Sequence, residues 1–586
     1  MNVREFLQSK SFLTLIGFCG LCALFTQLES PWWEGRLLSV AVETPPGFAS
    51  AQPLISFPEI DASPSIIDLS DLHALEEDND GDDAAAEDSA SSAEKPPSSD
   101  KEADDAAPQA PAFVPDRRDV ALLERMRQGT QLPENHRALL TIPCRDLPRR
   151  APDLDAKFEI PDGENAEVPS PAAIPAATPA TEPQSSEDAS AEKRAAPCKR
   201  YALDHFYASL RERALGRPGL TRWSQYGDSL VVGDTMTGEL RRMLQRQFGY
   251  GGHGFIYMGQ PLRQFGFEDI RIGASTAWEV RSVVRHSVTG GDMFGFGGVE
   301  FRAQSDSTLT IQPLKESSET RPLEHFRLLY FAPAGITEGS FRISVNGEGQ
   351  NVRFPTTPSS SGMHEITIPR GDHRVVFSNF STHLRWYGVI SESAGPGVVI
   401  DNLGQVSARE EHLLKINPAQ WRAQMELRAP DLVAFFYGVN GASSSAHRIG
   451  GEDGAYANAY RELLARAMAG SDTRECLVMS LLTRGTREGG GIRPTGAVTA
   501  MNAAQRAAAL SSQCAFFDTT AVMGSRADAT QRWAERQLLG ADLAHPTAAG
   551  YREIARRLHS ELMQGFIEYL ERRVAGHYAD AGGTTP

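Results

Sequence analysis

Residues 222–236 read RWSQYGDSLVVGDTM and place a serine, Ser229, at the end of an apolar run. The run predicts a short buried strand, and the residues from Gly238 onward predict an amphipathic helix. A serine at such a junction commonly caps the helix through its side-chain oxygen. An exposed serine on a tight strand-to-helix turn can instead be an activated nucleophile, because the helix N-terminus favours negative charge. Taken alone, this stretch favours the cap.

The chain beyond residue 198 alternates apolar strands with amphipathic helices, which indicates a parallel sheet covered on both faces. Between residues 262 and 396 the pattern changes to period-2 alternation with regular turns, as in a β-sandwich. The predicted fold class is α/β, a three-layer αβα sandwich with a parallel sheet, interrupted by an inserted all-β sandwich. The α/β part is expected at 198–261 and 397–575 and the insertion at 262–396. The expected elements of the α/β part are strands 221–227, 431–438, 476–482 and 514–518 and helices 237–248, 456–468, 500–510 and 549–564.

The N-terminal third has the composition of a membrane anchor followed by a tether. Residues 12–28, FLTLIGFCGLCALFTQL, are apolar, follow basic residues and precede no cleavage site of small residues. They predict an uncleaved transmembrane helix or signal anchor within residues 1–35. Residues 36–197 are acidic and then rich in Pro and Ala, and predict a disordered tether with at most a short helix around 121–126. A short C-terminal tail is expected at 576–586.

The formal net charge of the 586 residues is -17. Because no basic block can neutralise phosphates, nucleic acid is not expected as a partner. An exported chain can form disulfides. Cys476 and Cys514 each begin an apolar run, CLVMSLL and CAFFDTT, and could pair if these runs are neighbouring strands. Whether Cys144 and Cys198 pair or stay free is open at this point.

A nucleophilic serine needs a histidine base within hydrogen-bond reach and an acid that orients the base. Of the 14 histidines, only His545 has an acidic residue three positions earlier, Asp542, in GADLAHPTAAGYREIARRL. Such a pair can also be a polar loop before a helix. It follows the last predicted strand, however, and the carboxyl ends of parallel strands share one edge of a sheet. A third stretch, DLVAFFYGVNGASS, ends a strand at Asn440, whose amide suits either a turn or an oxyanion.

The stretches GDSL at 227–230, GVN at 438–440 and DLAH at 542–545, in this order, resemble the motifs of the SGNH (GDSL) hydrolase family. The β-sandwich between the first and the next motif resembles the carbohydrate-binding-module-like insertion of the periplasmic peptidoglycan O-acetylesterases. The segments VIDNLGQVSARE, ECLVMSLL and CAFFDTTAVMG are also similar to segments of that group. The resemblance covers residues 200–575 apart from the insertion.

The resemblance implies that Ser229 is the nucleophile, His545 the general base and Asp542 the residue that orients His545. The oxyanion hole would consist of the backbone N–H of Ser229, a second backbone N–H and the side chain of Asn440. The family takes the second N–H from a glycine, and the aligned residue here is Ser407. If that position needs a positive φ, the serine weakens the hole. The implied activity is removal of O-acetyl groups from a cell-wall glycan, with no cofactor and no metal.

Two other classes of function stay open. The same triad can pass its acetyl group to a sugar, as an O-acetyltransferase does, or the chain is a glycan-binding protein with a degraded site. The expected location is the inner membrane, with a single-pass anchor and the catalytic domain in the periplasm. The partners expected are the O-acetylated glycan and the membrane, and the oligomeric state is left open.

Two further patterns have competing interpretations. GYGGHG at 249–254 follows a predicted helix where a dinucleotide motif must follow a strand, so it predicts a helix stop and a loop that contains His253. Trp278 and Trp386 in the insertion could stack on sugar rings, but aromatic residues of β domains more often pack in the core.

Overall fold

The computed structural model of the protein describes ten segments of the chain, all within the unit Ser63–Pro586. They are residues 114–130, 138–141, 201–259, 265–286, 293–314, 321–441, 449–489, 491–495, 497–524 and 528–576. Within these segments no helix is long and apolar enough to cross a membrane. The predicted anchor at 12–28 and both Cys144 and Cys198 lie outside the described residues.

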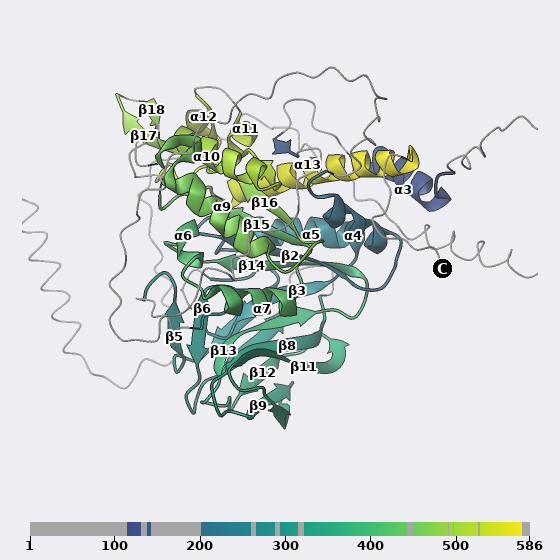
Figure 1. Ribbon diagram of the computed structural model, residues 1–586, viewed down its shortest axis with the longest axis vertical. Coiled ribbons are helices and arrows are strands. Elements are labelled where there is room, and N and C mark those ends of the chain that lie inside the picture. Colours follow the sequence, from purple (N-terminus) through teal and green to yellow (C-terminus); the bar gives the residue numbers. More distant parts are fainter. Residues whose placement is uncertain are drawn as a thin grey trace, which may run out of the picture. The chain divides into compact units, whose positions relative to one another are not determined.

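A mostly parallel sheet forms the centre of the α/β part (Figure 1). In spatial order it contains β1 (Leu139–Leu140), β19 (Ala515–Phe517), β16 (Glu475–Met479), β15 (Leu432–Phe436), β2 (Leu220–Gly227) and β14 (Gly397–Gly404). Neighbouring strands are parallel except β1 with β19. The parallel strands therefore have the chain order 2-1-3-4-5, and β2 lies where the order reverses, the usual place for a ligand site.

Helices cover both faces of this sheet. One face carries α3 (Arg117–Gly129), α4 (Asp204–Ala214), α5 (Thr235–Phe248) and α13 (Ala548–Val574), and the other α7 (Pro418–Arg428) and α9 (Ala455–Met468), with α10 (Ala497–Ser511) beside α9. Side chains along a strand alternate between the two cores, as the pleat requires. In β15, Val433 and Phe435 pack in one core, and Ala434 and Phe436 in the other. The predicted αβα layering of the hydrolase part is thus confirmed.

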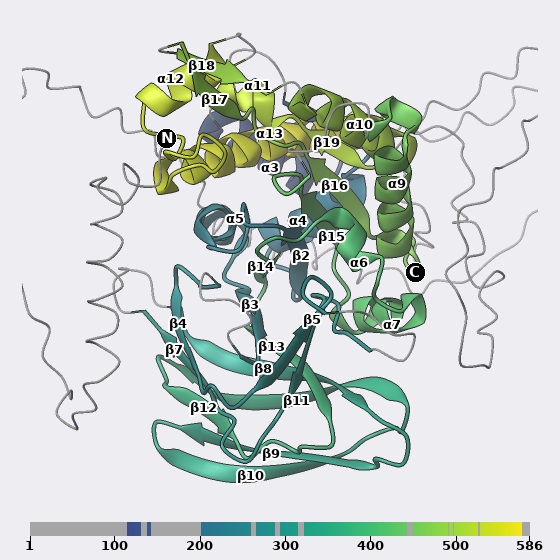
Figure 2. The ribbon, with the colours of Figure 1, turned by 90° about the vertical axis from the view of Figure 1, so that its left-hand side faces the viewer.

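The insertion is a sandwich of two antiparallel sheets, seen in Figure 2 below the parallel sheet. The first sheet contains β11 (Ser360–Gly371), β8 (Leu323–Ala332), β13 (Arg385–Glu392), β6 (Val299–Arg302) and β5 (Glu279–Ser282), and β3 (Gly252–Tyr257) also pairs with β13. The second contains β10 (Glu348–Pro355), β9 (Glu338–Val345), β12 (Val375–Ser378), β7 (Leu309–Pro313) and β4 (Ile270–Ala274). Trp278 and Trp386 are both buried in the sandwich core, so the core interpretation of these residues was correct.

The glycine-rich stretch 249–254 ends α5 at Phe248 as predicted, but only residues 249–251 form a loop, which corrects the rest of the sequence-based prediction. Its second half forms β3, and the side chain of His253 is fully buried with Nδ1 3.0 Å from Asp269 Oδ2. A Cβ added at Gly252 would lie 2.5 Å from the carbonyl oxygen of Ser391 on β13. The glycine therefore permits the close approach of two strands. The sandwich accordingly begins before residue 262.

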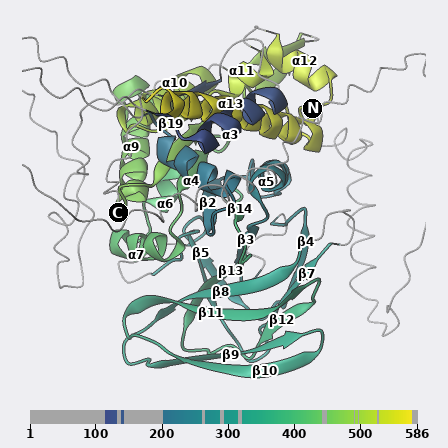
Figure 3. The same cartoon turned by 90° about the vertical axis from the view of Figure 1, so that its right-hand side faces the viewer.

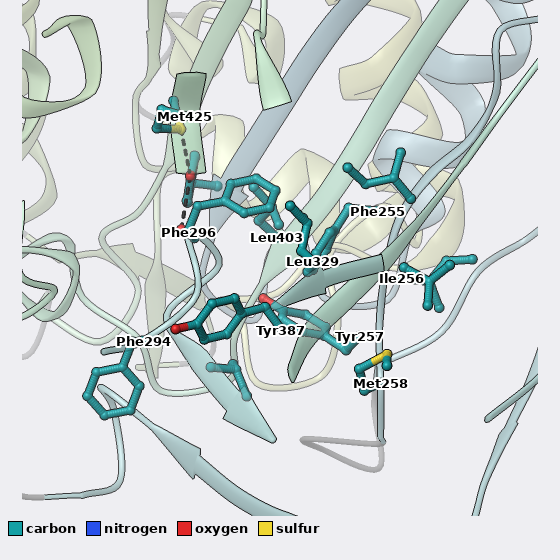
Figure 4. Close-up of a cluster of buried hydrophobic side chains, with 14 of the residues drawn as sticks. Phe255, Ile256, Tyr257, Met258, Phe294, Phe296, Leu329, Tyr387, Leu403 and Met425 are labelled. Carbon is teal, nitrogen blue, oxygen red and sulfur yellow. Dashed lines mark hydrogen bonds between the residues drawn. The ribbon is translucent and has the colours of Figure 1, made fainter. Parts of the chain in front are cut away.

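The sandwich and the parallel sheet share one continuous core. Figure 4 shows side chains of β3, among them Phe255 and Tyr257, together with Leu329 of β8, Leu403 of β14 and Met425 of α7. Because this core is continuous, we expect the insertion to be held rigidly against the α/β part.

A buried ionic cluster crosses the same junction. The guanidinium of Arg428 on α7 contacts Asp401 of β14, with Nε 2.8 Å from Oδ2, and Glu392 of β13, with Nη1 2.6 Å from Oε1. Burial alone would raise the pKa of Glu392, but Arg428 and Arg222 outweigh it and lower the pKa to about 2. A cluster of this kind specifies how two elements fit together more than it adds stability.

Two described elements lie inside the predicted tether of residues 36–197: α3 contains the short helix expected around 121–126, whereas β1 and the packing of both elements on the fold were not predicted. Helix α3 packs beside α13 (Figure 3), and β1 pairs with β19 at the edge of the sheet. Leu122 and Met126 of α3 are fully buried, and Asp119 lies 3.0 Å from the guanidinium of Arg573 on α13. The short apolar stripe of α3 cannot form a core alone, so composition gave no sign that it completes a distant one.

Cys476 and Cys514 form the predicted disulfide, which joins the start of β16 to the residue before β19. The bond closes a loop with a sequence separation of 38 residues. Replacing both cysteines with alanine is expected to lower the free energy of unfolding by about 3–4 kcal/mol, because the unfolded chain regains loop entropy. Urea denaturation of the two proteins measures this, and a loss below about 1 kcal/mol would contradict the expectation.

Candidate active site

Ser229 lies in the turn between β2 and α5. The strand ends at Gly227, and α5 begins at Thr235 with Asp234 as its N-cap. Ser229 is therefore too far from the helix to cap it, and the cap interpretation was wrong. The turn is tight, since a Cβ at Gly227 would lie 2.2 Å from the Val231 side chain. The sharp turn leaves the half-buried Ser229 free to make other contacts.

The structure brings Ser229, His545 and Asp542 together in one hydrogen-bonded chain. Ser229 Oγ lies 2.7 Å from His545 Nε2, and His545 Nδ1 lies 2.5 Å from Asp542 Oδ2. The side chain of His545 is 35% exposed and that of Asp542 is 52% exposed, so the group opens to solvent. A hydroxyl, an imidazole and a carboxylate in this order form the nucleophile, base and orienting acid of an acyl-transfer site.

The loop that carries Asp542 and His545 is fixed by its own hydrogen bonds. Asp542 Oδ1 accepts the backbone N–H groups of Ala544 and His545, both at 3.1 Å. Thr547 caps the N-terminus of α13 by accepting the N–H of Gly550. Helix α13 follows His545 and packs on α5, which follows Ser229. The contact between the two helices therefore fixes the position of His545 relative to Ser229.

Charge interactions keep Asp542 in its ionised form. Burial of this carboxyl would raise its pKa, but hydrogen bonds from the side chain and the backbone of His545 outweigh burial. The net result is a lowered pKa for Asp542. An ionised Asp542 accepts a hydrogen bond from the Nδ1–H of His545, and this keeps Nε2 able to take a proton from Ser229.

Asn440 and the turn at residues 405–408 lie next to each other beside Ser229. Asn440 Nδ2 donates to the carbonyl oxygen of Ala408 at 2.8 Å, which fixes the amide and leaves its second N–H available. Within the described part of the chain, the backbone N–H groups of Ser229 and Ser407 donate no hydrogen bond. These three donors are the predicted oxyanion-hole groups, and they are open to a substrate oxygen.

Ser407 adopts the backbone conformation expected of the glycine that it replaces. The N–H of Ala408 donates to the carbonyl oxygen of Gln405 at 3.1 Å, and Ser407 has φ 65°. This is the pattern of a type II turn, whose third residue is usually glycine. A non-glycine residue in this region costs about 1–2 kcal/mol. The exposed side chain of Ser407 meets no obstacle, and the turn keeps the shape that presents its N–H.

Asp228 is a functional residue whose role the sequence did not reveal. Its fully buried carboxylate accepts the backbone N–H groups of Leu230 at 3.0 Å and of Gly438 and Val439, both at 3.1 Å. Burial outweighs these hydrogen bonds and raises the pKa of Asp228 to about 6. The carboxylate ties the end of β2 to the end of β15 and so places Ser229 relative to Asn440. The only signal in the sequence was an acidic residue directly after a buried strand.

Glu410 is a second buried carboxyl close to the site. It opens the short helix α6 (Glu410–Leu413), directly after the 405–408 turn. Burial raises its pKa to about 7, and the negative charges of Glu411 and Asp228 contribute in the same direction. Glu410 thus places a buried carboxyl directly after the turn that holds Ser407.

Comparison with known proteins relates part of the chain to a known family. Residues 370–553 match the family model of the GDSL-like lipases and acylhydrolases. That range includes Ser407, Asn440, Asp542 and His545, while Ser229 lies before it, on the other side of the insertion. No curated protein sequence matches the chain.

Among solved structures, a peptidoglycan O-acetylesterase is similar with a TM-score of 0.51 and 19% sequence identity, covering 62% of this chain and 96% of that one. An active-site mutant of a family two carbohydrate esterase from Clostridium thermocellum has a TM-score of 0.21 and 9% sequence identity. The match covers 49% of this chain and 98% of that one. An α/β hydrolase from the metagenome of Lake Arreo, Spain, has a TM-score of 0.21 and 16% sequence identity. The match covers 30% of this chain and 74% of that one. The two lower scores are too small to support an argument. The family model thus relates residues 370–553 to the GDSL-like lipases and acylhydrolases, and the shared fold agrees with that relation.

Proposed function

We propose that this protein is a serine esterase that removes O-acetyl groups from a cell-wall glycan. The observation that carries the proposal is the continuous contact from Ser229 through His545 to Asp542, with hydrogen-bond donors open beside it. The acetylated glycan is supported by the fold shared with a peptidoglycan O-acetylesterase along 96% of that chain, a share that requires the insertion as well as the hydrolase part.

In the first half of the reaction, Ser229 Oγ attacks the acetyl carbonyl carbon while His545 Nε2 takes its proton. The oxyanion that forms accepts hydrogen bonds from the N–H groups of Ser229 and Ser407 and from Asn440. The intermediate then collapses, the bond to the sugar oxygen breaks, and His545 returns its proton to that oxygen. The products are the free sugar hydroxyl and an acetyl-serine.

In the second half, His545 removes a proton from a water molecule that attacks the acetyl-serine, and acetate and free Ser229 result. Transfer of the acetyl group to a sugar would use the same residues. Hydrolysis is favoured because both His545 and Asp542 are exposed to solvent, so water reaches the acyl-enzyme readily. We further propose that residues 12–28 anchor the protein in the inner membrane, with the hydrolase domain in the periplasm.

Acetate release from O-acetylated peptidoglycan tests this function directly. The expected result is release of acetate by the intact protein, with 4-nitrophenyl acetate hydrolysed as a small neutral ester. Adding an acceptor glycan to the reaction separates the two outcomes of the acyl-enzyme. Acetylation of the acceptor in place of acetate release would overturn the hydrolase proposal in favour of a transferase.

Substitutions at Ser407 test its backbone N–H as an oxyanion donor. Ser407→Gly is expected to keep kcat for 4-nitrophenyl acetate within about threefold, because glycine adopts the same backbone conformation without steric cost. Ser407→Val is expected to lower kcat by about 10²-fold, because a β-branched residue disfavours positive φ and turns the donor away. Steady-state kinetics of both variants measure this, and full activity in the valine variant would exclude Ser407 from the oxyanion hole.

A further inference from the structure

A small cavity lies between the insertion and the oxyanion-hole turn. Its walls come from the end of β5 and the turn that follows, and from the oxyanion-hole turn: Val280, Ser282, Val284, Arg285, His286, Gln405 and Val406. Its volume is about 70 Å³, enough for roughly five water molecules at ~10–15 Å³ each. Figure 2 shows β5 below α6, on the side of the sandwich that faces the parallel sheet.

The cavity is directly coupled to the proposed active site. The backbone N–H of Gln405 donates to the carbonyl oxygen of Gly227 at 3.0 Å, two residues before Ser229. The carbonyl oxygen of Gln405 closes the turn that holds Ser407. A group seated in the cavity would therefore lie beside the turn that presents the N–H of Ser407.

The walls of the cavity are held in place before any ligand binds. Arg285 and His286 both donate their backbone N–H to the carbonyl oxygen of Ser282, at 3.2 and 3.1 Å. Lys415 Nζ donates to the carbonyl oxygen of Val283 at 3.2 Å, and Gln405 Nε2 donates to that of Gly297 at 2.5 Å. These bonds tie the insertion to the loop of the hydrolase part.

The lining combines apolar surface with hydrogen-bond donors and has no acidic side chain. Val280, Val284 and Val406 supply the apolar part. His286 Nδ1 accepts the N–H of Ser282 at 3.2 Å, so in the neutral ring Nε2 carries the proton. Within the described part of the chain, no carboxylate pairs with the exposed guanidinium of Arg285, although the protein as a whole carries a net charge of -17. Such a lining suits a small anion that has a short apolar part.

We propose that this cavity is a subsite for a carboxylate-bearing substituent of the glycan, with Arg285 as the residue that binds the carboxylate. The proposal rests on the proposed function, because it describes how the acetylated sugar is oriented at Ser229. A guanidinium is the natural partner of a carboxylate, and the three valines suit the carbon atoms next to the charge. The carboxylate could belong to an ether-linked lactyl group, as in N-acetylmuramic acid, or to a uronic acid.

Direct binding to the Ser229→Ala protein tests the subsite without turnover. We expect N-acetylmuramic acid or glucuronic acid to bind about 10- to 100-fold more tightly than neutral N-acetylglucosamine, as measured by ligand-observed NMR titration. The acid that binds more tightly identifies the source of the carboxylate. Arg285→Gln should remove the preference, and Arg285→Lys should restore part of it. Equal binding of all three sugars, or a preference that survives Arg285→Gln, would overturn the proposal.

Kinetics of the active protein provide the second readout. Arg285→Gln is expected to lower kcat/KM for O-acetylated N-acetylmuramic acid, whose lactyl carboxylate is free, by about 10-fold, mainly through KM, and to change 4-nitrophenyl acetate hydrolysis less than twofold. Arg353→Gln is the matched control, since Arg353 is an exposed arginine on β10 of the other sheet. An equal loss for both substrates would mean that Arg285 supports the machinery rather than the sugar. If the intact protein releases no acetate while the binding preference persists, the proposed function fails and the subsite stands.

Discussion

Replacing Ser229 with alanine is expected to abolish acetate release, with kcat reduced by at least about 10⁴-fold. Removal of the nucleophile from a Ser-His-Asp site leaves only the contribution of the oxyanion hole and of substrate binding. The variant should fold normally, because Ser229 Oγ contacts only His545 and the turn is held by Asp228. The loss should therefore appear in kcat, with the thermal midpoint of unfolding unchanged.

Acetate release and mass spectrometry together check this expectation. The intact protein should gain the mass of one acetyl group at Ser229 during rapid mixing with 4-nitrophenyl acetate, and the variant should gain none. Ser344→Ala is a matched control, because Ser344 lies on β9 of the sandwich, in a different part of the fold. Residual activity above about 1% in Ser229→Ala would exclude a covalent role for this serine and overturn the esterase mechanism.

The elements that hold the triad could be predicted from local pattern, because each has a periodic apolar face. The expected strand 221–227 is β2, and the expected helices 237–248 and 549–564 are α5 and α13. Helix α13 runs ten residues further than predicted, to Val574, since its apolar face continues through Phe566 and Leu570. Local periodicity thus gives the position and type of an element better than its end.

Elements that depend on a distant partner could not be predicted in this way. Strand β3 lies in a glycine-rich stretch with no strand pattern of its own, and it forms because β13 accepts it as a neighbour. Helix α3 contains the short helix expected around 121–126, but its packing on α13 had no sign in the local sequence. For such segments the stabilising contacts are tertiary, so a short window of sequence does not contain them.

The same distinction applies within the site. Ser229, Asp542 and His545 could be singled out from the sequence, because GDSL at 227–230 and DLAH at 542–545 resemble the motifs of a known family. The role of Asp228 could not, since it rests on N–H groups supplied by residues 438–439 of another strand. The positive φ at Ser407 likewise depends on a tertiary contact. The backbone N–H of Gln405 donates a hydrogen bond to Gly227, and the carbonyl oxygen of Gln405 accepts the N–H of Ala408 in the turn that contains Ser407.

Replacing Asp542 with asparagine is expected to lower kcat by about 10³- to 10⁴-fold, a loss of the size seen when the orienting acid of a triad becomes an amide. Asparagine has nearly the same shape, and its Oδ1 can still accept the N–H groups of Ala544 and His545. Its amide nitrogen, however, replaces the oxygen that lies 2.5 Å from His545 Nδ1. An N–H donor there stabilises the tautomer with the proton on Nε2, which can no longer accept the proton of Ser229.

If Asp542 acts by orienting His545, the Asp542→Asn protein should lose activity without losing stability. Because the loop keeps its backbone hydrogen bonds and the side chain is 52% exposed, the free energy of unfolding should change by less than about 1 kcal/mol. Asp528→Asn serves as the matched control, since Asp528 is another exposed aspartate, paired with Arg532. Proton NMR of the His545 ring should show the changed tautomer. A loss of activity below tenfold, or a loss that follows unfolding, would mean that Asp542 supports the loop without setting the state of the base.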